Sequence, residues 1–245
     1  MIPISIDDTF KFSCSAKVPC FNACCRDLNQ FLTPYDILCL KNHLGMTSGA
    51  FLERYTTQHT GPETGLPVIA LKPDDALKLK CPFVTESGCS VYNARPSSCR
   101  MYPLARAVSR SRETGKITVH FALIKESHCR GFEQETTQTV RQWIENQKIA
   151  GYNEINDLLM EIISLKNHTR PGPLDMKSSH FFHIALYDLD RFRPNIFEKG
   201  LLDHLHLDPD ILEAVKNNDV ELLKLSHRWI KQILFTDFRP RKIVQ

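Results

Sequence analysis

Cysteine is the residue type that most constrains what this chain can fold into. The sequence has nine cysteines among 245 residues, and none lies beyond position 129. They form an early group, a middle group and two single positions: Cys14, Cys20, Cys24 and Cys25; Cys81, Cys89 and Cys99; Cys39 and Cys129. A chain of this length can bury a sizeable core and does not need disulfides to hold a tiny fold together. In a reducing compartment, the cysteines therefore indicate metal ligands or redox thiols.

The composition predicts a cytoplasmic protein. The hydrophobic fraction of 42% and the charged fraction of 24% are ordinary globular values, and the net charge of +3 is too small to indicate nucleic acid as a partner. The first residues, MIPISIDDTF, are acidic where a secretory signal would be basic and then apolar. No apolar run reaches the length of about 18 residues that a membrane span needs. We therefore expect no membrane partner and reduced thiols.

Hydrophobic spacing and turn residues predict an α+β fold that is mainly helical, with a small antiparallel sheet and metal-anchored loops. The expected strands are 66–71, 101–108 and 117–124, and the last two form a hairpin whose basic stretch, 106–112, is a solvated tip. Segments 1–32 and 56–65 are expected to be irregular. The expected helices are about 34–45, 48–55, 138–165 with Gly151 as a point of division, 180–188, 194–205, 209–216 and 219–235.

The distribution of cysteines and turn residues predicts two parts joined by a linker. Residues 1–165 are expected to form a cysteine-cluster metal-binding domain. Residues 166–178, KNHTRPGPLDMKS, contain two prolines and a glycine and are expected to be the linker. Residues 179–245 form a helical C-terminal region that ends in a frayed basic tail.

The adjacent pair Cys24–Cys25 favours a polynuclear centre. A zinc knuckle places two thiolates on one ion with two to four residues between them. Neighbouring side chains tend to point apart, so adjacent cysteines are better placed to reach two metals, or a metal and a redox partner. The chain has no CxxC pair, which weakens zinc-ribbon and thioredoxin interpretations. A thiol redox sensor ranks last, because a disulfide between adjacent cysteines is strained.

The middle group has local features that suit a ligand set. A turn at Gly88 lets the backbone around Cys89 approach a metal. Arg95 and Arg100 flank Cys99, where cations would offset the negative charge of several thiolates. An equally weighted alternative is that both arginines form surface ion pairs with acidic residues.

Other residues of metal-binding type are interpreted as structural. Cys39 lies between two leucines on an expected helix and behaves as a small apolar residue. The HFFH run at 180–183 and the HLH run at 204–206 lie among apolar neighbours, without a cysteine or an HExxH pattern nearby. His128 could be a ligand or a proton carrier beside Cys129, but exposure at a strand end is the simpler interpretation.

The middle group resembles a known family. CPFVTESGCSVYNARPSSCRMYPL is similar to the signature of the YkgJ-like, or CxxCxxCC, family, which reads CPFL, a spacer, then GxCxIYxxRPxxCRxFP. The matching positions are Cys81, Pro82, Phe83, Gly88, Cys89, Val91, Tyr92, Arg95, Pro96, Cys99, Arg100 and Pro103. FKFSCSAKVPCFNACC resembles the family's FxCxxCGxCC opening, and HCRGF, with Cys129, resembles its later cysteine. The resemblance covers roughly residues 10–165 and implies a zinc- or iron-chelating domain.

The opening departs from the family's spacing. Five residues separate Cys14 from Cys20 and three separate Cys20 from Cys24, where the family has two and two. Phe21 occupies the position of the family's glycine. Relatives that the resemblance implies include flagellin lysine N-methylases and proteins described as iron–sulfur oxidoreductases. A shared domain transfers a metal site more safely than a reaction, so enzymatic activity is left open.

We therefore expect an iron–sulfur cluster held by clustered cysteines, in a protein that acts on a protein or peptide. We call the expected metal ligands the site cysteines: Cys14, Cys20, Cys24, Cys25, Cys81, Cys89, Cys99 and Cys129. Arg95 and Arg100 are expected to contact or tune the cofactor. The alternative is a zinc-stapled binding module without catalysis, which would lose its fold on chelation.

Overall fold

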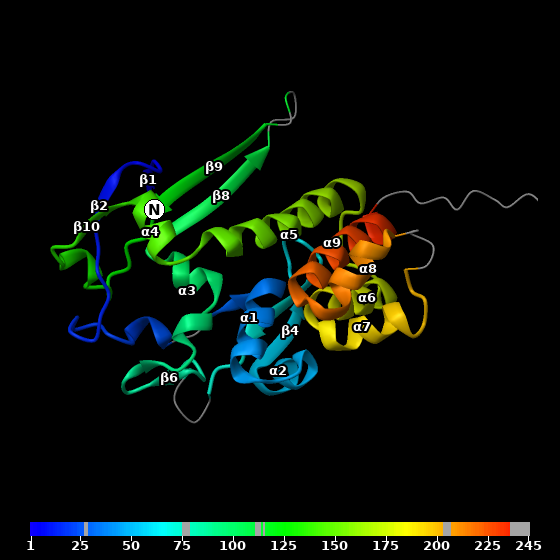
Figure 1. Cartoon of the computed structure of the whole chain (residues 1–245). Helices are drawn as coiled ribbons and strands as arrows, with labels where there is room; N and C mark the ends of the chain where they lie inside the picture. The colour runs from blue at the N-terminus through cyan, green and yellow to red at the C-terminus, as the bar shows by residue number, and fades with distance from the viewer. Residues whose placement is uncertain (27–28, 75–78, 111–113, 115, 203–206, 236–245) are drawn as a thin grey trace, which may run out of the picture. The chain divides into compact units, whose positions relative to one another are not determined.

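A computed structural model describes residues 1–26, 29–74, 79–110, 114, 116–202 and 207–235 (Figure 1). Helices and several small antiparallel sheets confirm the α+β class. The chain forms two compact units. The cysteine unit comprises Met1–Gln30 and Lys72–Tyr152, and the helical unit comprises Phe31–Leu71 and Asn153–Gln245. The expected domains, 1–165 and 179–245 with the linker 166–178, stay a prediction beside these two units.

The cysteine unit combines short strands with short helices. Its strands are β1 (Ile2–Ile4), β2 (Thr9–Lys11), β6 (Val84–Thr85), β7 (Gly88–Cys89), β8 (Leu104–Arg110), β9 (Ile117–Leu123) and β10 (Thr137–Thr139). Its 3-10 turns are η1 (Ala23–Cys25), η3 (Tyr92–Ala94) and η4 (Gly131–Glu133), and its α-helices are α3 (Ser97–Met101) and α4 (Val140–Asn146). The strand orders are β1–β9–β8, β10–β2 and β6–β7.

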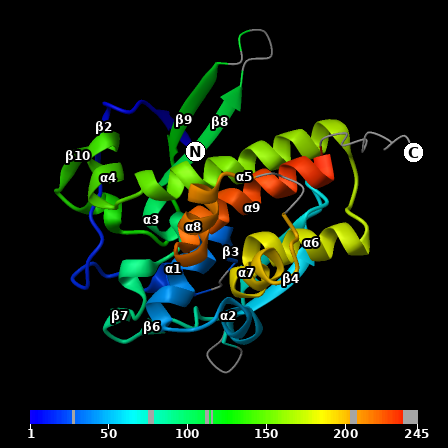
Figure 2. The ribbon, with the colours of Figure 1, turned by 45° about the vertical axis from the view of Figure 1, so that its right-hand side comes forward.

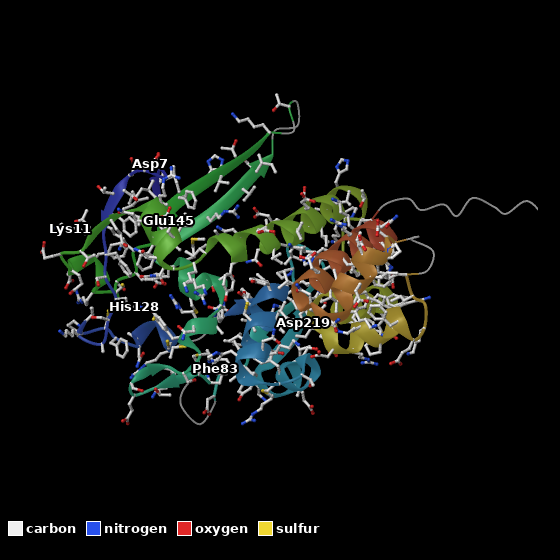
Figure 3. All side chains as sticks on the ribbon, in the orientation of Figure 1. Asp7, Lys11, Phe83, His128, Glu145 and Asp219 are labelled. Carbon is white, nitrogen blue, oxygen red and sulfur yellow. The ribbon has the colours of Figure 1, made fainter. Side chains whose placement is uncertain are left out.

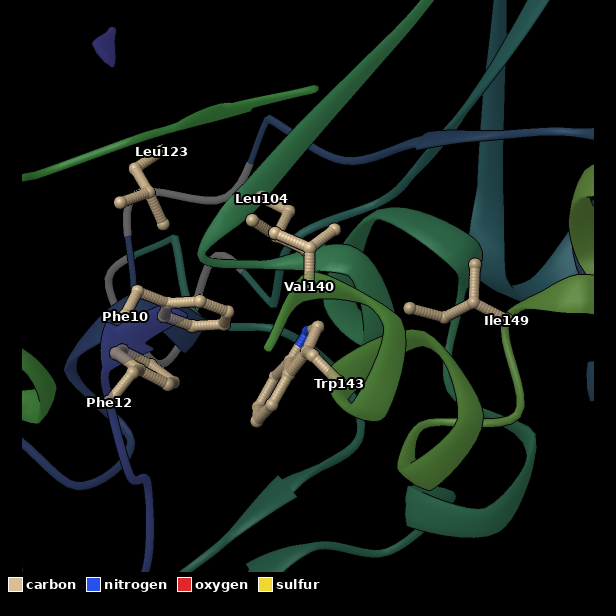
Figure 4. Close-up of a cluster of buried hydrophobic side chains, with 7 residues drawn as sticks. All are labelled: Phe10, Phe12, Leu104, Leu123, Val140, Trp143 and Ile149. Carbon is tan, nitrogen blue, oxygen red and sulfur yellow. The ribbon is translucent and has the colours of Figure 1, made fainter. Parts of the chain in front are cut away.

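The hydrophobic core of the cysteine unit lies between these strands and α4. Its buried members are Phe10, Phe12, Leu104, Leu123, Val140, Trp143 and Ile149 (Figure 4). Phe12 packs edge-on against Trp143, with ring centroids 5.4 Å apart, an arrangement that aromatic quadrupoles favour. Cys129 packs against the same cluster, so the core supports the loop that carries this cysteine.

The hairpin expected in this unit is confirmed, with a later start. Strands β8 and β9 pair from Leu104 opposite Leu123 to Arg110 opposite Ile117. The first residue expected in the strand, Met101, instead ends α3. The expectation of a tip over 106–112 is wrong for 106–110, which belong to β8, and 111–112 lie outside the described residues.

The long helix expected over 138–165 is two helices. Helix α4 ends at Asn146, and α5 runs over Ala150–Thr169. The chain turns at Lys148, not at Gly151, and Lys148 has a φ of 54°. This left-handed conformation costs an L-residue about 1–2 kcal/mol. The turn is compensated by the next residue, Ile149, whose side chain is 0% exposed in the core.

The helical unit contains a sheet with the strand order β3–β5–β4 and most of the helices. Its strands are β3 (Phe31–Leu32), β4 (Thr56–Thr60) and β5 (Pro67–Leu71). Its helices are α1 (Pro34–Leu44), α2 (Ser48–Tyr55), α6 (Met176–Tyr187), α7 (Leu189–Phe197), α8 (Pro209–Asn217) and α9 (Asp219–Phe235). Most of α5 also belongs to this unit, although the helix begins shortly before Asn153. Helix α9 packs against α6, α7 and α8 (Figure 2).

Helix caps in this unit are mostly where the sequence predicts them. Thr33 and Asp36 form a capping box at the start of α1, and Gly45 ends that helix with a φ of 63°. Thr47 caps α2, and Asp208 caps α8 ahead of Pro209. The prediction of a loop over 56–65 is wrong for its first half, because 56–60 pairs with β5 along its whole length.

The C-terminal helices differ from the prediction at their ends. Helix α5 continues to Thr169, and α6 already begins at Met176 with Asp175 as its cap. Helix α7 begins at Leu189, earlier than expected, and carries Pro194 inside it. Residues 203–206, which include the HLH run, and the tail from 236 lie outside the described residues. No helix in the described part of the chain is long and apolar enough to span a bilayer.

Helix α9 buries a neutral histidine. His227 is 3% exposed, and its Nδ1 lies 2.7 Å from the carbonyl oxygen of Leu223. Its Nε2 has no hydrogen-bond partner among the described residues. Burial lowers the pKa of His227 from 6.5 to about 4.

Mild acid should therefore destabilise the folded chain through His227. Between pH 6.5 and 4 the unfolded chain binds a proton that the folded chain does not, so stability falls as the pH falls through this window. At pH 5 the loss relative to pH 7.5 is about 2 kcal/mol. In urea unfolding, the free energy of unfolding of His227→Gln should fall less between pH 7.5 and pH 5 than that of the wild type, by this amount. The exposed His43→Gln is the control, and an unchanged difference in His227→Gln would contradict the assignment.

Candidate metal centre

The early cysteines lie on a loop that backbone bonds hold in place. The N–H of Ser13 donates to the carbonyl of Gly131 at 3.1 Å. Asn22, in a left-handed conformation with φ 65°, starts the turn η1, which presents Cys24 and Cys25 together. The side-chain amide of Asn22 donates to the carbonyl of Thr85 at 3.0 Å, which ties this loop to the β6–β7 hairpin.

Direct bonds also join the early group to the other cysteines. The N–H of Cys81 donates to the carbonyl of Cys25 at 2.8 Å. The N–H of Arg130, directly after Cys129, donates to the sulfur of Cys20 at 3.1 Å. The loop after Cys129 and the middle group are thus both held to the early loop. A backbone N–H on a cysteine sulfur is also the kind of contact that stabilises a thiolate ligand.

The middle group lies on the β6–β7 hairpin and on α3. Gly88 has a φ of 124°, which favours glycine, and a Cβ built there would lie 3.1 Å from the ring of Phe21. Phe21, the residue in place of the family's glycine, therefore packs over the hairpin turn that precedes Cys89. Cys99 lies on α3, and its thiol donates to the Oε1 of Gln30 at 3.5 Å.

Cys24 lies near enough to several other site cysteines to affect their pKa values. Burial raises the pKa values of Cys14, Cys81 and Cys89, and the nearby Cys24 raises each of them further. A hydrogen bond with Cys25 lowers the pKa of Cys24 to about 6 and raises the pKa of Cys25. For Cys14, Cys81 and Cys89 burial is the larger cause, and the repulsion adds to it because ionisation of one thiol disfavours ionisation of the others.

The remaining site cysteines belong to the same neighbourhood. Cys20 and Cys129 both raise the pKa of Cys14, after burial and Cys24. Cys99 likewise raises the pKa of Cys25, after the bond with Cys24. Each site cysteine therefore lies within electrostatic reach of at least one other.

Arg95 and Arg100 are buried, which removes the premise of the surface ion-pair alternative. The guanidinium of Arg95 lies over the ring of Tyr92 at 3.8 Å from its centroid and donates to the carbonyl of that residue. Its charge favours ionisation of Cys89, although burial outweighs it and the pKa of that thiol is raised. Arg95 thus supplies a cation to the thiols.

Arg100 connects backbone segments. It is 6% exposed, and its guanidinium donates to the carbonyls of Asn93, Arg95 and Gln147. It also lies over the ring of Tyr152. The geometry therefore makes Arg100 a structural tie beside Cys99, and its assignment to the cofactor stays a prediction.

The thiols of the site cysteines are near one another but are not arranged around a single point. Among the described residues, no three Cys, His, Asp or Glu side chains converge as the ligands of one metal would. Within the described part of the chain the site cysteines form no disulfides, and all are exposed or half-buried. Soft thiol donors within one neighbourhood, accessible and held by backbone bonds, fit zinc, iron or an iron–sulfur cluster. A thiol that binds such a metal would lose its proton.

The other candidates are placed less directly. Cys39 lies on α1 in the helical unit and is half-buried. The Nε2 of His128 (Figure 3) lies 3.5 Å from a carboxylate oxygen of Glu126, and both residues are near enough to shift the pKa of Cys24. His183 is half-buried on α6, and burial lowers its pKa. The contributions of Asn22 and Gln30 were not apparent from the sequence.

Comparison with known proteins agrees with this donor set. The profile of the CxxCxxCC family, described as a proposed zinc- or iron-chelating domain, matches residues 13–142, more than half of the 245 residues. The chain belongs to the CxxCxxCC family. The matched segment contains every site cysteine, so this CxxCxxCC protein carries a metal-binding domain. No curated protein and no solved structure matches the chain.

Proposed function

We propose that this CxxCxxCC protein holds an iron–sulfur cluster through its site cysteines. The observation that carries the proposal is the pair of bonds that joins the cysteine segments, from the Cys81 N–H to the Cys25 carbonyl and from the Arg130 N–H to the Cys20 sulfur. These bonds bring early, middle and late cysteines into one neighbourhood around Cys24. A zinc ion and an iron–sulfur cluster each take about four protein ligands, so the preference for a cluster rests on the adjacent pair Cys24–Cys25.

The chain's own residues would support the cluster in distinct ways. The turn η1 presents two adjacent thiols, which suits a centre with more than one metal atom. Arg95 offsets part of the negative charge. Arg100 holds the backbone carbonyls of Arg95, ahead of Cys99, and of Gln147. A bound cluster would supply electron-transfer chemistry. The proposal includes a cytoplasmic protein that modifies a protein or peptide, as its resemblance to YkgJ-like proteins and flagellin lysine N-methylases suggests.

Anaerobic purification tests the metal. The expected protein is coloured, contains iron and acid-labile sulfide in similar amounts, and bleaches on reduction. A colourless protein that takes up stoichiometric zinc even after anaerobic reconstitution with iron and sulfide would overturn the cluster.

The zinc-stapled module remains the second candidate, because the cysteine loops have little regular structure. The regular elements at their cysteines are one-turn helices and two-residue strands. A metal could therefore be what orders them, as in structural zinc sites. This candidate predicts loss of tertiary structure on chelation, and helical circular dichroism and unfolding midpoint that survive chelation unchanged would refute it.

A further inference from the structure

A cavity of about 400 Å³ lies among helices α6, α7 and α9, which pack on one another in the helical unit (Figure 2). Its volume falls within the range of about 300–1,000 Å³ that is usual for small-molecule sites. All the residues that line the cavity belong to the helical unit, whereas the site cysteines belong to the cysteine unit. The cavity is therefore a candidate site of its own, apart from the metal centre.

The inner wall of the cavity is aromatic. It contains Phe181 of α6, Phe192 of α7 and Trp229 of α9. The centroid of the Trp229 ring lies 6.2 Å from that of Phe181 and 5.3 Å from that of Phe192. Phe192 and Trp229 are 1% and 3% exposed, so packing on every side holds these two rings in place. Aromatic rings fixed in this way offer an apolar surface that suits a flat aromatic group.

Trp229 also carries a hydrogen-bond donor without a partner. Its indole Nε1 is buried and has no acceptor among the described residues. The N–H of a buried tryptophan usually has a partner, so its lack indicates a missing acceptor. Because Trp229 lines the cavity, a bound molecule with an acceptor atom is a partner that the described residues do not supply.

Cationic side chains predominate at the outer part of the cavity. Arg191 and Lys199 line it and are exposed, and neither forms an ion pair within the described part of the chain. Glu198, next to Lys199, supplies one carboxylate, and the exposed imidazole of His180 lies in the same lining. Two cations against one carboxylate favour a ligand with a negative charge.

We propose that this cavity binds a small aromatic anion, with its rings against Phe181, Phe192 and Trp229 and its acid group beside Arg191 and Lys199. The aromatic wall supplies most of the contact area, and the two cations select for charge. Carboxylates and sulfonates share this chemistry, so either acid group should be accepted. An uncharged molecule with the same rings should bind less tightly.

Two dyes with the same rings test the proposal: anilinonaphthalene sulfonate, which is an anion, and N-phenylnaphthylamine, which lacks the sulfonate. Dye fluorescence measures the affinity of the full-length protein for each. The wild type should bind the anionic dye about tenfold more tightly than the neutral dye. In the double variant Arg191→Gln, Lys199→Gln, affinity for the anionic dye should fall about tenfold and affinity for the neutral dye should stay the same. Phe181→Ala should weaken both dyes alike.

Arg228→Gln is the matched control. Arg228 is exposed on α9, next to Trp229 in the sequence, and does not line the cavity, so both affinities should equal those of the wild type. An equal loss in this control would mean that the anionic dye responds to net charge, and would overturn the proposal. A wild type that binds neither dye, or both equally, would overturn it as well. So would wild-type affinities in the double variant or in Phe181→Ala. None of these readouts depends on metal content, so failure here leaves the proposed metal site untouched.

Discussion

Replacing Cys24 and Cys25 together with serine should lower metal affinity by more than about a thousandfold, so that the purified protein loses nearly all its metal. A structural thiolate site is worth about 10–16 kcal/mol over four ligands, so two ligands account for several kcal/mol. The expectation follows from the position of Cys24, whose thiol influences early and middle cysteines alike. Metal analysis of anaerobically purified protein measures it.

Cys39→Ser is the matched control for this prediction. It removes one thiol from helix α1 in the helical unit and should leave metal content at the wild-type level. Full metal content in the double Cys24→Ser, Cys25→Ser variant would contradict the central place given to this pair. Loss of metal in Cys39→Ser would show instead that the site includes a cysteine that we leave out.

Arg100→Lys should destabilise the folded protein by about 3 kcal/mol. Arg100 is 6% exposed, and its guanidinium donates hydrogen bonds to the carbonyls of Asn93, Arg95 and Gln147. A lysine keeps the charge, but its single ammonium group cannot reach three acceptors in this planar arrangement. Buried carbonyls without a donor then account for the loss. Denaturant unfolding at neutral pH measures the change.

The matched control is Arg141→Lys on α4. Arg141 is exposed and pairs with Asp7 at the surface, so its replacement should leave the unfolding midpoint nearly unchanged. Equal midpoints for Arg100→Lys and the wild type would mean that charge, and not the bonding geometry, is what the protein needs at this position.

Elements with strong local signals were predicted well from the sequence. Thr33 and Gly45 bound α1 as their capping chemistry requires, and α9 begins and ends at the predicted residues. These signals depend on side chains within a few residues of the helix ends. Such features can be read without knowledge of the rest of the fold.

Elements that depend on distant partners were not predicted. Residues 56–60 are polar and resemble a loop, but β5 supplies a full set of backbone partners for them. The break at Lys148 lies where a local pattern would continue the helix, because burial of Ile149 outweighs the cost of the turn. Tertiary contacts override local preference in both cases.

The candidate site shows the same division. Cysteine spacing and the resemblance predict the site cysteines and the two arginines, since thiol and guanidinium groups are visible in the sequence. The backbone bond from Cys81 to Cys25 has no such sequence signal, because every residue except proline has the same donor. The packing of Phe21 over Gly88 also needed the structure, although the altered family position pointed to that residue.

X-ray absorption at the metal edge of anaerobically purified protein tests the central claim most directly, because it reports the atoms bound to the metal. The claim that clustered cysteines bind one metal centre predicts a first shell dominated by sulfur at about 2.3 Å. This shell should be lost or reduced in the double Cys24→Ser, Cys25→Ser variant and kept in Cys39→Ser. A first shell of nitrogen and oxygen would contradict the claim. So would a sulfur shell that is unchanged when Cys24 and Cys25 are replaced.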